Sequence, residues 1–358
     1  MNRLMLFAAS SLLSLSSLAQ TEVTTYEPGL TAEGITYFLP ATSLRIVVKA
    51  TKKHFTPGEF SEYADRYLHL KDATLTPHDE WTIDGISLYS FGTADKTKAY
   101  SIKLKQKTSA PFVALTPDGR LLSVNAPSTE KEPTLPLPSV VKSKEKVING
   151  ADFKTEEILS AGSTAKMAEL TANEIYDIRE NRGLLTKGQA DFMPKDGEQL
   201  KLMLANLDTQ EEGLLQLFKG SVTSETHTFA FDLTPMQDIN QQIVFCFSKY
   251  LGLVDNDDPS GTPYYISVKD LHTLPATNAE AKAKQKDSNS DLKYIVPSRA
   301  KVTIFTEQGE EATQTFPMAQ FGNVEHLGGE LFNKKETTHV QLSPVTGNIS
   351  KIEAAQPK

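Results

Sequence analysis

The chain has 358 residues, with 37 Lys and Arg against 45 Asp and Glu, which gives a formal net charge of −8. Binding of nucleic acid or another polyanion by the whole surface is therefore disfavoured. The length exceeds what one hydrophobic core usually fills, and it predicts two or three domains.

The first residues have the layout of a secretory signal peptide. Arg3 supplies one positive charge, an apolar run covers residues 4–18, and the chain turns polar at Gln20. This run is shorter than the roughly 20 apolar residues that cross a bilayer as a helix. We therefore expect cleavage of residues 1–19, a mature chain without a transmembrane segment, and export to the periplasm or the medium.

Residues 21–126 are predicted to form a β-rich domain with one helix, because strand-type runs of β-branched and aromatic residues recur along them. Thr56-Pro57-Gly58-Glu59 has the pattern of a helix start, and apolar residues then recur at helical spacing, which predicts a helix over residues 57–69. Asp118-Gly119 predicts a hairpin turn.

The middle of the chain changes character twice. Residues 127–147 contain four prolines among polar residues and are predicted to be an extended linker. Residues 155–220 are predicted to form a long helical hairpin, because apolar residues recur among charges on both sides of a glycine-containing break. Asp196 is the expected N-cap of the second helix, and Gly220 is its expected end.

Strand-type runs return in residues 221–358, interrupted by a polar insert at 277–293. The fold class predicted from these patterns is α+β, with two mainly antiparallel β domains and the helical hairpin between them. Similar turn strings at 113–119 and 340–347 fit a duplicated β domain, or two hairpins that obey the same turn rules.

Cys246 is the only cysteine, which excludes an internal disulfide. It lies in the apolar run 243–247, where a free cysteine behaves as a small buried hydrophobe. A nucleophilic cysteine needs exposure and positive surroundings, which this run lacks.

Few residues suggest a metal site, since none of the seven histidines is spaced to share an ion with another. Asp255, Asp257 and Asp258 lie in an oxygen-rich string of the kind that can hold calcium. The string departs from the EF-hand pattern at Pro259, and such a string between two strands is typically a turn. These aspartates are a weak metal candidate, and we expect no cofactor.

No sequence motif assigns a catalytic residue, because neither a G-x-S-x-G string nor a glycine-rich phosphate loop occurs. A carboxylate pair for glycoside hydrolysis is defined by its separation in space, so the sequence does not reveal one. The string 319–325 resembles a loop and offers Gln320, Phe321 and Asn323 as a candidate recognition loop. The alternative is an ordinary loop that anchors Phe321 in the core.

Strings spread along most of the chain together resemble an uncharacterised family of exported proteins from Gram-negative gut-type anaerobes, classed as a domain of unknown function. The strings are Gly34–Pro40, Leu44–Val48, Thr56–Phe60, Glu174–Glu180, Met193–Glu198, Ala319–Glu325 and Leu331–Lys335. The resemblance implies no activity and no set of functional residues.

The expected function is that of an exported cell-envelope protein, a non-enzymatic binding or assembly module in which the helical hairpin meets a protein or glycan partner. The alternative is a hydrolase that acts on an envelope or dietary polymer through carboxylates.

Overall fold

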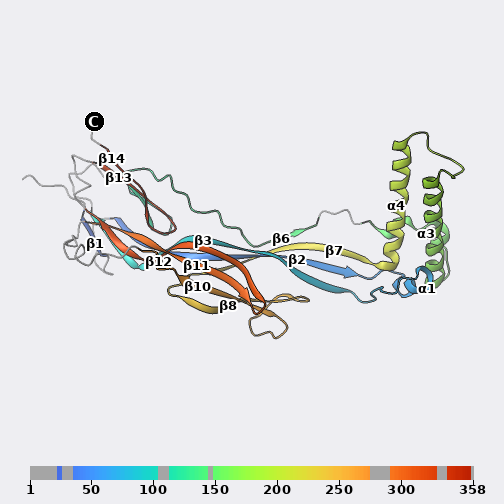
Figure 1. Ribbon diagram of the computed structural model, residues 1–358, viewed down its shortest axis with the longest axis horizontal. Coiled ribbons are helices and arrows are strands. Elements are labelled where there is room, and N and C mark those ends of the chain that lie inside the picture. Colours follow the sequence, from blue (N-terminus) through green and yellow to red (C-terminus); the bar gives the residue numbers. More distant parts are fainter. Residues whose placement is uncertain are drawn as a thin grey trace, which may run out of the picture.

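The computed structural model describes residues 22–25, 35–103, 113–143, 148–274, 291–328 and 337–355. Long strands run along an elongated, β-rich molecule, and the helices gather at one end of it (Figure 1). The expected leader at 1–19 lies outside the described residues. So does the polar insert up to residue 290, and the rest of that insert leads into strand β11.

The first sheet has the strand order β1-β3-β2-β7-β6, with antiparallel pairing throughout. Its strands are β1 (Glu22–Thr25), β2 (Ile35–Thr56), β3 (His78–Lys103), β6 (Ser139–Lys142) and β7 (Ser221–Leu233). Strand β2 is central, because its residues 44–55 pair with β3 on one side and with β7 on the other. Alternate residues of β2 therefore face opposite sides of the sheet.

The second sheet has the order β12-β11-β10-β8-β9 and is also antiparallel. Its strands are β8 (Ile239–Ser248), β9 (Gly252–Val254), β10 (Thr262–Asp270), β11 (Leu292–Thr306) and β12 (Gly309–Leu327). It packs against the first sheet through a shared core in which Ile46 of β2, Ile266 of β10 and Val302 of β11 are fully buried. The two sheets thus form a sandwich around one apolar core.

The third sheet, β14-β13-β5-β4, is smaller. Its strands are β4 (Val113–Leu115), β5 (Leu121–Val124), β13 (Thr337–Leu342) and β14 (Ile349–Ala355). The expected turn at Asp118-Gly119 joins β4 to β5, with Gly119 at φ 90°. The two similar turn strings therefore lie on two hairpins of one sheet, whose strands β5 and β13 pair at Val124 and Val340.

The sheets do not divide at the domain boundaries predicted from the sequence. Strand β7, from the predicted domain 221–358, pairs with β2, from the predicted domain 21–126. Strand β13 likewise pairs with β5. Composition predicts that a run forms a strand, but the backbone groups that pair strands are the same in every residue, so composition does not choose the partner. The expected linker 127–147 also contributes, because β6 extends the edge of the first sheet.

Two long helices, α3 (Thr164–Lys187) and α4 (Gly197–Lys219), lie side by side at the helical end of the molecule (Figure 1). Their starts follow from capping: Ser163 Oγ accepts from the N–H of Lys166, and Asp196 Oδ1 accepts from the N–H of Gln199 at 2.7 Å. Helix α4 ends at Gly220, as expected. None of the helices among the described residues combines the length and the apolar composition that crossing a membrane requires.

Short helical segments complete this end of the molecule. They are η1 (Ser61–Tyr63), α1 (Ala64–Leu68), η2 (Gly150–Phe153) and α2 (Glu156–Leu159). Phe60, Ile175, Leu214 and Phe218 are buried in the core that these segments share with α3 and α4.

The helix predicted over residues 57–69 is wrong in its extent, because only η1 and α1 form there. Thr56 still belongs to β2. The N–H of Phe60 donates to the carbonyl oxygen of Leu217 at 2.7 Å, and a side chain at Gly58 would collide with that same carbonyl. This contact with α4 holds residues 57–60 outside the helix despite their favourable local pattern.

Candidate binding site

The three aspartates considered for a metal lie on an exposed turn between β9 and β10. The N–H of Asp258 donates to the carbonyl of Asp255, and the Asp258 carboxylate accepts from the N–H of Ser260 at 2.8 Å. Within the described part of the chain, no three His, Cys, Asp or Glu side chains converge as metal ligands would. The loop thus has the internal hydrogen bonds of an ordinary turn.

The predicted recognition loop is a strand, so its loop assignment is wrong. Gln320, Phe321 and Asn323 belong to β12, at a point where residues 319–322 face the single residue Pro297 of β11. Proline has no N–H to donate, and the extra residues bulge there, which explains the loop-like Gly and Asn composition.

The side chains of this bulge point into the protein. The Gln320 amide accepts from the N–H of Thr42 and donates to the carbonyls of Thr42 and Pro235, at 2.7–2.9 Å. Phe321 packs against the core of the sandwich, as the alternative reading expected. Gln320 therefore fastens β12 to the first sheet.

Cys246 is buried, as expected, at 2% exposure. Burial raises the pKa of its thiol, and the charge of Asp258 acts in the same direction. The thiolate is therefore disfavoured, and the residue behaves as part of the core.

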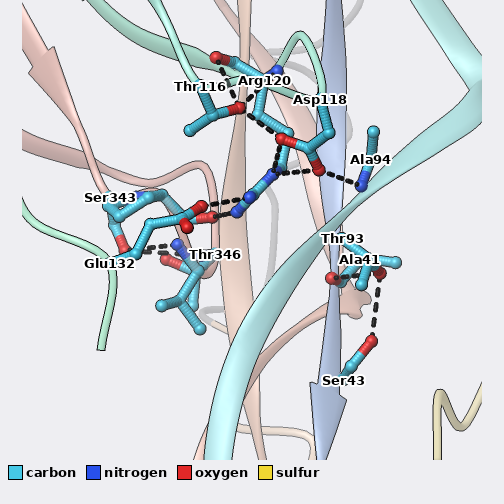
Figure 2. Close-up of polar contacts among 12 residues, drawn as sticks. Ala41, Ser43, Thr93, Ala94, Thr116, Asp118, Arg120, Glu132, Ser343 and Thr346 are labelled. Carbon is cyan, nitrogen blue, oxygen red and sulfur yellow. Dashed lines mark hydrogen bonds and ion pairs between the residues drawn. The ribbon is translucent and has the colours of Figure 1, made fainter. Parts of the chain in front are cut away.

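A polar cluster around Arg120 joins the first and third sheets (Figure 2). Arg120 is 4% exposed, and its Nε donates to both carboxylate oxygens of Asp118, at 2.8 and 2.9 Å. Its two terminal nitrogens donate to the carbonyl of Pro344 and to the carboxylate of Glu132. Asp118 in turn accepts from the N–H of Ala94 on β3 at 3.1 Å.

The Arg120 cluster is closed on itself. Burial by itself raises the pKa of Asp118, but the hydrogen bonds from Arg120 and Thr116 outweigh that effect, so the pKa lies below its usual value. Every nitrogen of the guanidinium has a partner within the chain. Such a cluster holds two sheets together.

An open groove of about 510 Å³ lies on the outer face of the second sheet. Its floor is formed by β10 and β11, and the turn from β11 to β12 closes one end. Its lining side chains include Ser267, Lys269, Lys301, Phe305, Glu307 and Glu310.

Alternation along the strands explains why these side chains lie on the outer face, where Lys269 and Lys301 are exposed and Thr303 is covered, at 7% exposure. Ile266 and Val268 of β10, and Val302 and Ile304 of β11, are fully buried in the sandwich. The residues between them therefore point outward. Strand pairing then places Ser267 opposite Thr303, and Tyr265 opposite Phe305.

Tyr265 and Phe305 form an aromatic pair beside the groove. Their rings stack with centroids 5.6 Å apart and an interplanar angle of 29°. Ile243 of β8 lies opposite Tyr265 and is 37% exposed, so an apolar strip crosses three strands of the outer face. Hydroxyl groups border it: Thr313 Oγ1 donates to Thr303 Oγ1 at 3.2 Å and lies 3.1 Å from Glu310 Oε2.

Two lysines of the groove are held opposite each other. Lys269 and Lys301 are direct partners in the pairing of β10 with β11. Like charges in this position destabilise a sheet by roughly 0.2–1 kcal/mol. Lys301 has a weak, exposed ion pair with Glu310 at 3.8 Å. Within the described residues, no carboxylate lies in ion-pair distance of Lys269.

The sequence did contain part of this signal. In both 265–269 and 301–305, polar or aromatic residues alternate with apolar ones, which is typical of a half-exposed strand. The register that brings the two lysines together depends on the pairing of β10 with β11, which end and begin at Asp270 and Leu292, and no local pattern encodes it.

The fold and the groove define a class: a β-sandwich protein with an open, mixed polar and aromatic groove on one outer face. A family model described as "Domain of unknown function (DUF4831)" matches residues 33–350, and the chain belongs to this family. The resemblance of the sequence to a domain of unknown function is thereby confirmed. Neither the curated proteins nor the solved structures gave a match.

Proposed function

We propose that this protein is an exported, non-enzymatic binding module of the cell envelope, and that its ligand is a carbohydrate held in the groove of the second sheet. One observation carries the proposal: an aromatic pair and a row of hydroxyl groups lie together on an open sheet face. Export rests on the predicted leader at residues 1–19.

The chemistry of the groove matches that of a sugar. A pyranose ring has an apolar face of C–H groups, which packs well on an aromatic ring, and a rim of hydroxyls that both donate and accept. Phe305 and Tyr265 supply the aromatic surface, while Ser267 supplies a hydroxyl in the neighbouring row. A binding site of this kind needs only a few polar groups at fixed positions on a rigid floor, and paired strands provide such a floor.

The direct test is a binding screen of the purified protein, without its leader, against soluble polysaccharides. We expect at least one to bind, and Phe305→Ala to weaken its binding about tenfold or more, because the aromatic contact is lost. Tyr250→Ala is the matched control, since Tyr250 is 63% exposed after β8 and does not line the groove. Equal binding by both variants, or no binding of any polysaccharide, contradicts the proposal.

Export is tested separately. The full chain is expressed with a C-terminal tag in a Gram-negative host, and the cells are fractionated. We expect the tagged protein in the periplasm or the medium, with an N-terminus that begins after Ala19 or Gln20. An uncleaved chain in the cytoplasm would remove this part of the proposal.

A carboxylate-dependent hydrolase is the second candidate, and one observation favours it. Glu307 and Glu310 both line the groove, and glycoside hydrolysis uses two carboxylates about 5–10 Å apart. Release of reducing ends from the bound polysaccharide would favour this function, provided that Glu307→Gln and Glu310→Gln abolish the release and keep the binding. Binding without release favours the non-enzymatic module.

A further inference from the structure

The outer edge of strand β3 is covered by other segments of the chain at two places. The N–H of Trp81 donates to the carbonyl of Lys249, in the turn between β8 and β9, at 2.7 Å. The N–H of Ala94 donates to the carboxylate of Asp118, in the turn between β4 and β5, at 3.1 Å (Figure 2). Both N–H groups point away from β2, the strand that pairs with β3 on its other side.

Between these two places the same edge is open. Successive residues of an antiparallel strand direct their N–H and C=O groups to opposite sides. The pairing of β3 with β2 has no register shift over residues 85–95, so Ile86, Leu88 and Ser90 direct these groups to the same side as Ala94. Strand β1 pairs with β3 only beyond this stretch. Among the described residues, the outward N–H and C=O groups of Ile86, Leu88 and Ser90 thus have no hydrogen-bond partner.

A groove of about 700 Å³, the edge groove, runs along this open stretch. Residues 86–90 of β3 line one side, and residues 311–314 and Phe316 of β12 line the other. Strand β12 is the edge of the second sheet, so the edge groove lies where the two sheets of the sandwich meet at their sides. Leu88 and Phe316 are both buried members of the shared core. The edge groove therefore combines unpaired backbone groups with apolar side chains.

We propose that the edge groove binds an extended peptide segment of a partner protein, which adds a strand to the first sheet between Trp81 and Ala94. An extended peptide offers N–H and C=O groups on one side at every second residue, about 6.8 Å apart, and this matches the spacing along β3. Its alternate side chains point to one face. Those that face the edge groove lie beside Leu88 and Phe316 and are apolar.

The charge of the edge groove selects a basic peptide. Glu311 is the only charged residue that lines it, and no basic side chain of the described residues lies in ion-pair distance of its carboxylate. The net charge of −8 also attracts a basic segment at long range. A Lys or Arg at one end of the peptide pairs with Glu311.

The covered ends of this edge argue against pairing with the same edge of a second copy. An antiparallel pair of β3 strands centred on Leu88 places the turn with Asp118 in each copy against the turn with Lys249 in the other. Because these turns lie beside the strand, they keep the two backbones farther apart than the roughly 4.8 Å of paired strands. A peptide of about five residues, about 14 Å long, spans residues 86–90 and avoids both turns.

The probe that tests the proposal is a synthetic peptide in which valine and threonine alternate between two terminal lysines. Its binding to the purified protein is measured by the fluorescence anisotropy of a label on one end. We expect it to bind, and we expect the same peptide with N-methylated backbone amides to bind at least tenfold more weakly. The methylated peptide keeps the side chains and the charge but has no N–H to donate to the edge. Equal binding of the two peptides, or no binding of the first, overturns the proposal.

Ser90→Pro shows whether the peptide binds at this edge. Proline removes the outward N–H of residue 90 and is tolerated on an edge, because that N–H makes no bond to β2. We expect at least a tenfold loss of peptide binding. Ser90→Ala is the matched control, since it keeps the N–H and should bind as the wild type does. Thermal unfolding verifies that both variants fold, and unchanged binding by folded Ser90→Pro overturns the proposal.

Glu311→Gln tests the charge without altering the backbone, so it decides the matter even where Ser90→Pro does not fold. We expect a loss of binding of about threefold at low salt, and a smaller loss at moderate salt, which screens the ion pair of the wild type. Equal binding by Glu311→Gln and the wild type at low salt overturns the basic peptide as the partner. No described residue lines both the edge groove and the groove of the second sheet, so these results do not depend on the proposed carbohydrate ligand.

Discussion

Arg120 and the lysine pair Lys269–Lys301 carry positive charge in opposite surroundings, one buried and the other exposed. Arg120 is almost fully buried, and each of its nitrogens has an acceptor inside the chain. Lys269 and Lys301 lie on an outer sheet face, point at solvent and repel each other. The first arrangement stabilises the fold, whereas the second lowers its stability slightly and leaves donors free. Charge in the closed cluster thus holds two sheets together, whereas charge on the open face contributes little, because Lys301 has only a long, exposed ion pair with Glu310.

Among the substitutions that distinguish the two regions, Arg120→Ala is expected to lower the free energy of unfolding the most. The change leaves a cavity, an unpaired carbonyl at Pro344 and two carboxylates without their cation. We expect the free energy of unfolding to fall by about 3 kcal/mol. This is the low end for a broken buried pair, because the side chains of Asp118 and Glu132 are 40% and 50% exposed. Urea unfolding measures the loss.

The control for Arg120→Ala is Lys166→Ala, which breaks an exposed pair with Glu169 on α3. Its free energy of unfolding should stay close to that of the wild type, because an exposed pair contributes little. A similarly small change in Arg120→Ala would show that the cluster does not hold the sheets together.

A smaller effect is expected from Gly92→Ala on β3. A side chain there would collide with the carbonyl of Pro344 and with the guanidinium of Arg120, and one of these neighbours is backbone. We expect this overpacking to lower the free energy of unfolding by about 2 kcal/mol. Gly85→Ala on the same strand meets no atom within 4 Å and should change stability by less than about 0.5 kcal/mol. Equal Tm values for the two variants would contradict the packing described for the cluster.

The pH dependence of stability gives a further measure of the cluster. The pKa of Asp118 is lowered in the folded state from a reference value of 3.8, so the charged carboxylate stabilises the fold at higher pH. That stabilisation is lost as the pH falls below about 4 and through the lowered pKa. Asp118→Asn should therefore show a shallower loss of stability than the wild type between pH 5 and pH 2, measured by urea unfolding at each pH.

The smallest effect, and one of opposite sign, is expected in the groove. Lys269→Gln removes the repulsion with Lys301 and should raise the free energy of unfolding by about 0.5 kcal/mol. Differential scanning calorimetry at low salt is suited to so small a gain. A loss of stability instead would mean that Lys269 makes a favourable contact within the fold, which would weaken the contrast with Arg120.

Local patterns predicted much of the secondary structure. The cap at Asp196, the end of α4 at Gly220 and the turn at Gly119 are all where the sequence places them, because each depends on hydrogen bonds or φ values within a few residues. The buried state of Cys246 follows from its apolar run in the same way.

The tertiary structure decided the features that depend on contacts between residues far apart in the chain. Contact with Leu217 shortened the helix expected at 57–69, and Pro297 turned an expected loop at Gln320 into a bulged strand. The pairing of β7 with β2 and of β13 with β5 replaced two expected β domains by three shared sheets. The sequence by itself determined which segments become strands and helices, since that depends on side chains a few residues apart. Only strand register, set by packing across the whole sandwich, placed Lys269 opposite Lys301 and created the groove.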